Sequence, residues 1–116
     1  MNRPPRRFLK VTGLRPEHAP FYRELHAAVW PSVLRMIKEC HIQNYSIYEQ
    51  EIGGKLYLIA YLEYVGDDWE GDNARMAADP ETRRWWTQTD PCQEPLPQAA
   101  AKGAIWVDAT EVFYLP

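Results

Sequence analysis

The sequence predicts an α+β fold of the ferredoxin-like kind, in which an antiparallel sheet carries its helices on one face. The main support is the order of the local patterns, which reads β-α-α-β-β-α-α-β along the chain. The chain has 116 residues, enough for one core, so we expect a single domain over residues 1–116. Hydrophobic residues make up 46% of the chain, which is typical of a folded protein rather than a disordered one.

A strand and two helices are predicted first. Residues of alternating character make Arg6–Leu14 a strand, and Met1–Pro5 before it is expected to form a loose arm. A helix then begins at Pro16 or Pro20, because a proline in the first turn leaves no intrahelical hydrogen bond unmade. A second helix is expected over Ser32–Cys40, with its first serine as a possible N-cap.

A β-hairpin is predicted next. Ile42–Gln50 and Lys55–Val65 both alternate, and the Gly53-Gly54 pair between them is suited to a tight turn. Successive side chains of a strand point to opposite faces of the sheet. We therefore expect Tyr45 and Tyr48 on opposite faces.

Two further helices, a loop and a last strand complete the predicted fold. Asp67–Ala78 and Asp79–Thr89 each begin at an aspartate, which is a good N-cap. Pro91–Pro97 holds three prolines and is expected to be a loop, and Gln98–Gly103 after it is expected to be irregular. Ile105–Leu115 is predicted to be the fourth strand of the sheet.

A sheet of this kind covers one face with its own helices and leaves the other face open. Several strand residues are aromatic and have no helix of their own to cover them. We therefore expect two copies of the chain to stack their open faces and form a homodimer.

The composition argues against several partners and compartments. The net charge is −3, whereas nucleic acids and anionic membranes attract proteins with clustered lysines and arginines. No segment approaches the ~20 apolar residues of a membrane span, and Met1–Arg7 lacks the apolar stretch of a secretory signal. Cys40 and Cys92 belong to no ligand motif and are expected to be reduced thiols. We expect a cytoplasmic protein that binds neither nucleic acid nor membrane.

The residues that suggest chemistry are histidines and aromatics. His26 shares one helical stripe with Tyr22 and Trp30, and an imidazole titrates near neutral pH, as proton transfer requires. A buried histidine more often has a structural role, so the residues alone leave both interpretations open. Adjacent side chains on a helix point about 100° apart, so either Trp85 or Trp86 is expected to cover a pocket or an interface.

A cofactor is not expected. The three histidines and two cysteines lack the spacing of a zinc site, and the sequence has no glycine-rich phosphate loop.

Four short motifs follow one another along the chain. They are Tyr22-Arg23-Glu24-Leu25-His26 with Val29-Trp30-Pro31, Asn44-Tyr45-Ser46-Ile47-Tyr48, Arg84-Trp85-Trp86, and Glu111-Val112-Phe113-Tyr114-Leu115-Pro116. In this order they resemble the motifs of the L-rhamnose mutarotase family, over nearly the whole chain from about Phe8 to Pro116.

The resemblance implies an isomerase with a dimeric α+β-barrel fold. Its activity would be the cofactor-free interconversion of the α and β anomers of L-rhamnose, a 6-deoxyhexose, by acid/base ring opening. By position, His26 is implied to be the proton donor. Tyr22, Tyr45, Trp85 and Trp86 are implied to bind the monosaccharide.

Departures from the family pattern keep alternatives open. Ala27-Ala28 stands where the family typically has Asn-Pro, residues 66–83 form a longer segment, and residues 89–93 differ. L-fucose, another 6-deoxyhexose, is therefore an alternative sugar. Two other classes also remain open: a dimeric α+β-barrel protein of the monooxygenase kind, which shares the fold, and a non-catalytic sugar-binding protein, which would not need the histidine.

Overall fold

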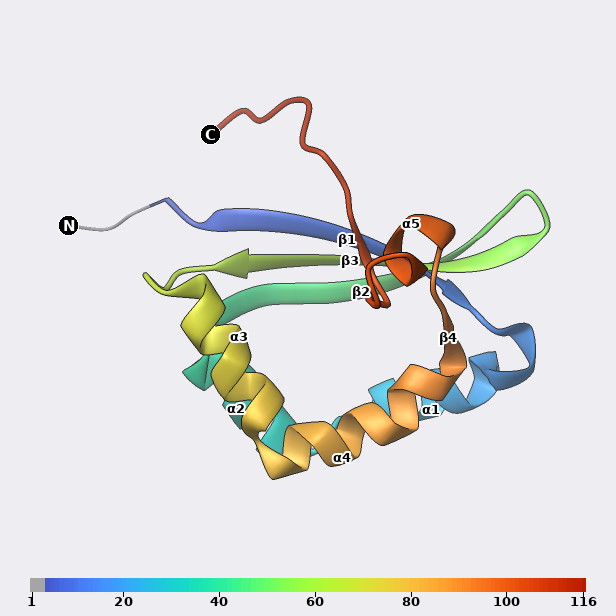
Figure 1. The fold of residues 1–116 in the computed structure, drawn as a ribbon, viewed down its shortest axis with the longest axis horizontal. Coiled ribbons are helices and arrows are strands. Elements are labelled where there is room, and N and C mark those ends of the chain that lie inside the picture. The colour runs from blue at the N-terminus through green and yellow to red at the C-terminus, as the bar shows by residue number, and fades with distance from the viewer. Residues whose placement is uncertain (1–3) are drawn as a thin grey trace.

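A curved antiparallel sheet forms one layer of the protein, and its four longer helices form the other (Figure 1). The computed structural model describes residues 4–116, so most of the predicted N-terminal arm, Met1–Arg3, lies outside the described residues. The elements are β1 (Arg6–Leu14), a 3-10 turn (Pro16–His18), α1 (Ala19–Ala27), α2 (Pro31–Glu39), β2 (Ile42–Ile52), β3 (Lys55–Tyr64), α3 (Trp69–Ala78), α4 (Pro80–Thr89), a second 3-10 turn (Asp90–Cys92), β4 (Gln93–Glu94), α5 (Pro97–Ala100) and β5 (Val107–Asp108).

The strand order is β2-β3-β1-β4, and β5 also pairs with β1. All of these pairings are antiparallel. Figure 1 shows α1, α2, α3 and α4 on the same side of the sheet. The predicted α+β class, with an antiparallel sheet and helices on one face, is therefore confirmed.

The core lies between the sheet and these helices. Alternate side chains of β3, namely Leu58, Ala60, Leu62 and Tyr64, are at most 5% exposed. Leu58 belongs to one buried cluster, and Leu62 and Tyr64 belong to another. The first, at the α1 end, contains Leu14, Ala19, Tyr22, Leu58 and Cys92, and the second, toward α3, contains Ile42, Leu62 and Tyr64. Burying a large apolar side chain stabilises a fold by about 1.5–3 kcal/mol, so each cluster anchors one end of the layer.

Local signals set most helix boundaries. The Asp68 side chain accepts a hydrogen bond from the backbone N–H of Gly71 at the start of α3, and Asp79 accepts one from Thr82 at the start of α4. The first helix ends at Ala27, and the next begins at Pro31. Trp30, the residue before this proline, has extended backbone, as the proline requires, so Pro31 begins a new helix and does not continue the first.

The prediction of a long last strand was wrong. Of Ile105–Leu115, only Val107–Asp108 pairs with β1, and Gln93–Glu94, in the predicted loop, pairs with the end of β1 instead. The outer edge of β1 is thus shared by two short segments. The stretch Gln98–Gly103 was predicted to be irregular, but it overlaps the short helix α5.

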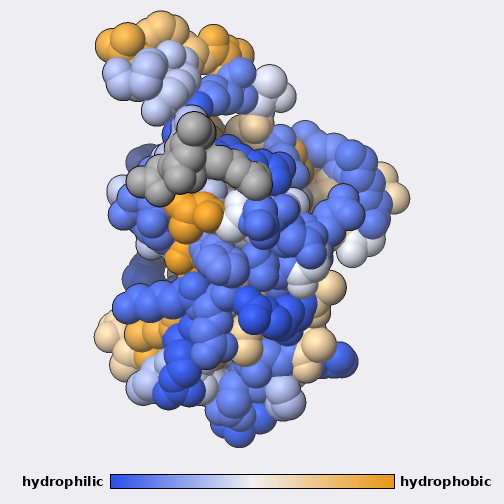
Figure 2. Space-filling view, turned by 90° about the vertical axis from the view of Figure 1, so that its left-hand side faces the viewer, coloured by the Kyte–Doolittle hydropathy of each residue, from blue (hydrophilic) through white to orange (hydrophobic). Residues whose placement is uncertain are grey.

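The C-terminal segment leaves the sheet after its last backbone bond, from Ala109 to Leu9. Val112 is 95% exposed, and Phe113 and Leu115 are each 78% exposed. Figure 2 shows apolar atoms gathered on the segment that projects at the top of the molecule. Within residues 4–116, no helix is long and apolar enough to cross a membrane.

Candidate active site

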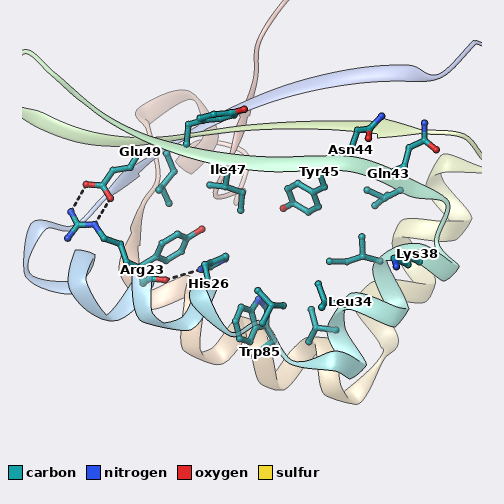
Figure 3. Close-up of a pocket in the computed structure, with 17 residues that line it drawn as sticks. Arg23, His26, Leu34, Lys38, Gln43, Asn44, Tyr45, Ile47, Glu49 and Trp85 are labelled. Atoms are coloured by element: carbon teal, nitrogen blue, oxygen red, sulfur yellow. Dashed lines mark hydrogen bonds and ion pairs between the residues drawn. The ribbon is translucent and has the colours of Figure 1, made fainter.

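A cavity of about 520 Å³ lies between β2 and the helices (Figure 3). Its volume falls within the range of ~300–1,000 Å³ typical of small-molecule sites. Apolar side chains line much of it: Val29, Val33, Leu34, Ile37, Ile42, Ile47 and Leu58. Because Leu58 belongs to one buried cluster and Ile42 to the other, the cavity lies between the two clusters.

His26 lines this cavity from α1. Its Nδ1 atom lies 2.9 Å from the backbone oxygen of Tyr22, one turn earlier. A carbonyl oxygen only accepts hydrogen bonds, so Nδ1 carries the hydrogen and donates it. In the neutral ring, Nε2 is then unprotonated and can accept a proton.

The surroundings of His26 favour its neutral form. Partial burial lowers the pKa of His26 below 6.5, and the bond to the Tyr22 carbonyl opposes this shift without cancelling it. The imidazole stacks on the Tyr22 ring with centroids 4.2 Å apart, and the Trp85 ring meets its edge at 5.4 Å. These contacts hold the ring in one orientation.

Two tyrosines also line the cavity. Tyr22 is only 5% exposed, and burial raises the pKa of its phenol. Desolvation also raises the pKa of Tyr45. Both phenols therefore keep their protons at neutral pH and can donate or accept hydrogen bonds.

A β-bulge directs Tyr45 toward the helices. The register between β2 and β3 shifts between Gln43 and Ser46, and Asn44 has a φ of 48°, a left-handed conformation that asparagine tolerates better than most residues. The Asn44 amide donates to Glu63 on β3, which holds the bulge in place. Figure 3 shows Tyr45 pointing from β2 into the cavity.

The two adjacent tryptophans of α4 differ in their surroundings. Trp85 is 5% exposed, lines the cavity, and packs edge-on against Trp30 with centroids 5.1 Å apart. Trp86 is 36% exposed and is not among the residues that line the cavity. The structure thus brings together four of the five residues that the motifs suggested, namely Tyr22, His26, Tyr45 and Trp85.

Sequence reasoning missed several polar residues of the cavity. Arg23 and Glu49 form an ion pair at one end, and Lys38, Gln43 and Asn44 lie toward the other end (Figure 3). The sequence does offer one indication of Arg23, because this residue is on the same helix as His26 and close to it. Nothing in the sequence indicates which carboxylate faces it.

The described residues offer no evident metal site. Within residues 4–116, no group of three or more His, Cys, Asp or Glu side chains is placed to hold a metal ion. The cavity instead gathers a neutral imidazole, two protonated phenols and a buried aromatic ring. Such a set can move protons on a neutral, hydroxylated ligand.

The fold and the cavity together define a small α+β protein whose cavity is lined by a histidine, tyrosines and a tryptophan, groups that are able to exchange protons and hydrogen bonds with a hydroxylated small molecule. Residues 7–115 match the sequence model of the family described as L-rhamnose mutarotase. The chain belongs to the L-rhamnose mutarotase family, whose activity is that of an isomerase, so the family predicted from the motifs is confirmed.

Individual relatives agree with this assignment. The chain is 31% identical to an L-rhamnose mutarotase of Bacillus subtilis (strain 168) over 96 residues, which cover 81% of this chain and 83% of the relative. It is 34% identical to one of Sinorhizobium fredii (strain NBRC 101917 / NGR234) over 76 residues, covering 63% of this chain and 65% of the relative. The fold is similar to the crystal structure of an L-rhamnose mutarotase from Formosa agariphila, with a TM-score of 0.71, 21% identity, and coverage of 96% and 99% of the two chains.

Proposed function

We propose that this chain interconverts the anomers of a 6-deoxyhexose, with L-rhamnose as the expected sugar, and that His26 donates the proton to the ring oxygen. The observation that carries the proposal is the orientation of His26, whose Nδ1 atom is engaged by the Tyr22 carbonyl while the ring lines the cavity. The reaction needs no cofactor, because ring opening only moves a proton from one oxygen to another.

The proton that His26 donates comes from the sugar itself. The anomeric hydroxyl gives its proton to Nε2, and its oxygen lone pair forms the C1 carbonyl as the bond from C1 to the ring oxygen breaks. The ring oxygen leaves with the bonding electrons and takes the proton from the imidazolium. Rotation about the C1–C2 bond exposes the other carbonyl face, and the same steps in reverse close the ring as the other anomer.

Aromatic residues are proposed to hold the sugar. A pyranose has an apolar C–H face that stacks on an aromatic ring, and Trp85 presents such a ring to the cavity. The hydroxyls of Tyr22 and Tyr45 are proposed to form hydrogen bonds with the sugar. The motif also assigns Trp86 to substrate binding, and we keep that role as a proposal, weaker than that of Trp85 because Trp86 lies outside the cavity lining.

We also propose that the protein is a cytoplasmic homodimer formed through the open face of the sheet. The chain exposes 7937 Å², whereas a compact monomer of its 13.6 kDa mass exposes about 6,600 Å². The excess is apolar in part, since Leu9 on β1, Tyr48 on β2 and Val112 in the C-terminal segment are 41%, 62% and 95% exposed. A solution mass of one chain at micromolar concentration would count against the dimer.

The direct test is saturation-transfer NMR of anomer exchange with L-rhamnose, L-fucose and their non-deoxy analogues. We expect exchange to be fastest with L-rhamnose, and a preference for L-fucose would support the alternative sugar. Binding without exchange would indicate a non-catalytic sugar-binding protein. Oxygen consumption without exchange would indicate chemistry of the monooxygenase kind.

A further inference from the structure

An ion pair crosses one end of the cavity, between a helix and the sheet. Arg23 on α1 donates to Glu49 on β2 twice, from Nε to Oε1 at 2.8 Å and from Nη2 to Oε2 at 2.6 Å. Both residues line the cavity, and Figure 3 shows them beside His26. Arg23 and His26 are three residues apart on α1, so they are neighbours on the helix surface.

The pair keeps unused hydrogen-bonding capacity. A guanidinium has five N–H groups, and Glu49 occupies two of those on Arg23. The structure gives no partner among residues 4–116 for the other three. Each carboxylate oxygen of Glu49 accepts one hydrogen bond from Arg23 and has room for another.

A structural role alone accounts poorly for this arrangement. The side chains of Arg23 and Glu49 are 57% and 25% exposed, and exposed ion pairs add little to stability. The guanidinium lowers the pKa of Glu49, so the carboxylate stays charged at neutral pH. A charged acceptor beside a charged donor suits a pair of neighbouring hydroxyls, one of which donates while the other accepts.

The opposite part of the cavity has an apolar wall on α2, although Lys38, Gln43 and Asn44 also lie toward that end. Val33, Leu34 and Ile37 form this wall, and Figure 3 shows Leu34 on the far side of the cavity from the ion pair. A 6-deoxyhexose has the same polarity along its length, because its C5 methyl group lies across the ring from the C2 hydroxyl. The α2 wall therefore suits the methyl group of the sugar, and the ion pair suits its hydroxyls.

We propose that Arg23 and Glu49 are specificity-determining residues that bind the neighbouring C2 and C3 hydroxyls of the sugar, with its methyl group toward Val33, Leu34 and Ile37. In this orientation C1, which is bonded to C2, lies next to His26. The inference rests on the proposed function, since it names how the sugar of that reaction is bound.

The test measures affinity rather than turnover, by titration calorimetry with L-rhamnose and its 2-deoxy and 4-deoxy analogues. We expect wild-type protein to bind the 2-deoxy sugar about 10- to 100-fold more weakly than L-rhamnose, as for a lost bond to a charged group. The quantity to compare is the dissociation constant of the 2-deoxy sugar divided by that of L-rhamnose. In Glu49→Gln and in Arg23→Met this ratio should fall to less than about threefold, because the substitution has already weakened the group that binds the C2 hydroxyl. The corresponding ratio for the 4-deoxy sugar should stay as in the wild-type protein.

The matched control is Glu94→Gln, which removes the carboxylate of an exposed pair with Arg15 outside the cavity lining. It should keep both wild-type ratios. Unchanged 2-deoxy ratios in folded Glu49→Gln and Arg23→Met would show that the pair only joins α1 to β2 and would overturn the inference. Sugar binding that depends on the C2 hydroxyl without any anomer exchange would overturn the proposed reaction but keep this inference, and no binding of any sugar would overturn both.

Discussion

Replacement of His26 separates its proposed chemical role from its structural one. His26→Ala removes one hydrogen bond, from Nδ1 to the Tyr22 carbonyl, and two ring contacts, at 4.2 Å with Tyr22 and 5.4 Å with Trp85. A hydrogen bond contributes about 0.5–1.5 kcal/mol and an aromatic pair a similar amount. We therefore expect the free energy of unfolding to fall by about 1.5–4.5 kcal/mol.

The effect on rate should be much larger. General acid–base help from one positioned group is worth about 10²–10⁴-fold, so the anomer-exchange rate per folded His26→Ala molecule should fall by that factor, with a much smaller change in sugar affinity. His26→Gln, which can form hydrogen bonds but cannot carry the proton, should be nearly as slow. The rate is measured by saturation-transfer NMR and the stability by urea unfolding.

The matched control is His18→Ala, since His18 is exposed and is not among the residues that line the cavity. It should change neither the rate nor the stability by much. A folded His26→Ala protein with an unchanged exchange rate would refute the reasoning. The search for the proton-transfer group would then move to Tyr22 and Tyr45, which also line the cavity.

Three further predictions follow from the same site. The exchange rate should fall on acidification with a midpoint below pH 6.5, because burial lowers the pKa of His26 and the neutral ring must accept the proton first; a rate that rises through this range, after subtraction of the uncatalysed reaction, would contradict that order of steps. Trp85→Ala should weaken sugar binding by about 1–3 kcal/mol, and Trp86→Ala should weaken it by less, because Trp86 lies outside the cavity lining; equal losses would show that both tryptophans contribute equally to binding. Exhaustive chelation should leave the exchange rate unchanged, and a loss that added metal restores would contradict the cofactor-free reaction.

Local signals explain which parts of the fold the sequence predicts well. Asp68 and Asp79 cap helices through their own side chains, and Pro31 acts on the backbone of its immediate neighbours. The segment Ile105–Leu115 differs, because its alternating pattern requires a partner along its whole length. That partner is the edge of β1, which is shared with Gln93–Glu94 through contacts between residues about 80 positions apart in the chain, as the Gly13–Glu94 pair shows.

The same distinction applies to the site. Tyr22 and His26 are one helical turn apart, so their contact follows from helix geometry and is visible in the sequence. Arg23 and Glu49 meet only because the sheet lies over α1. The bulge at Asn44, which sets the direction of Tyr45, also depends on pairing with β3 and on the bond to Glu63.

The reaction itself explains why one histidine can be enough. A mutarotase must act on both anomers, which differ only in the position of one hydroxyl at C1. The anomeric oxygen and the ring oxygen are bonded to the same carbon, so they are equally far apart in either anomer. An imidazole that lies between the axial and equatorial directions at C1 can therefore reach the anomeric oxygen in both anomers, provided that the rest of the sugar does not move. In the proposed mode of binding, the His26 ring, oriented by its bond to the Tyr22 carbonyl, and the different groups that line the cavity meet this requirement, because they would hold the sugar while only C1 rotates.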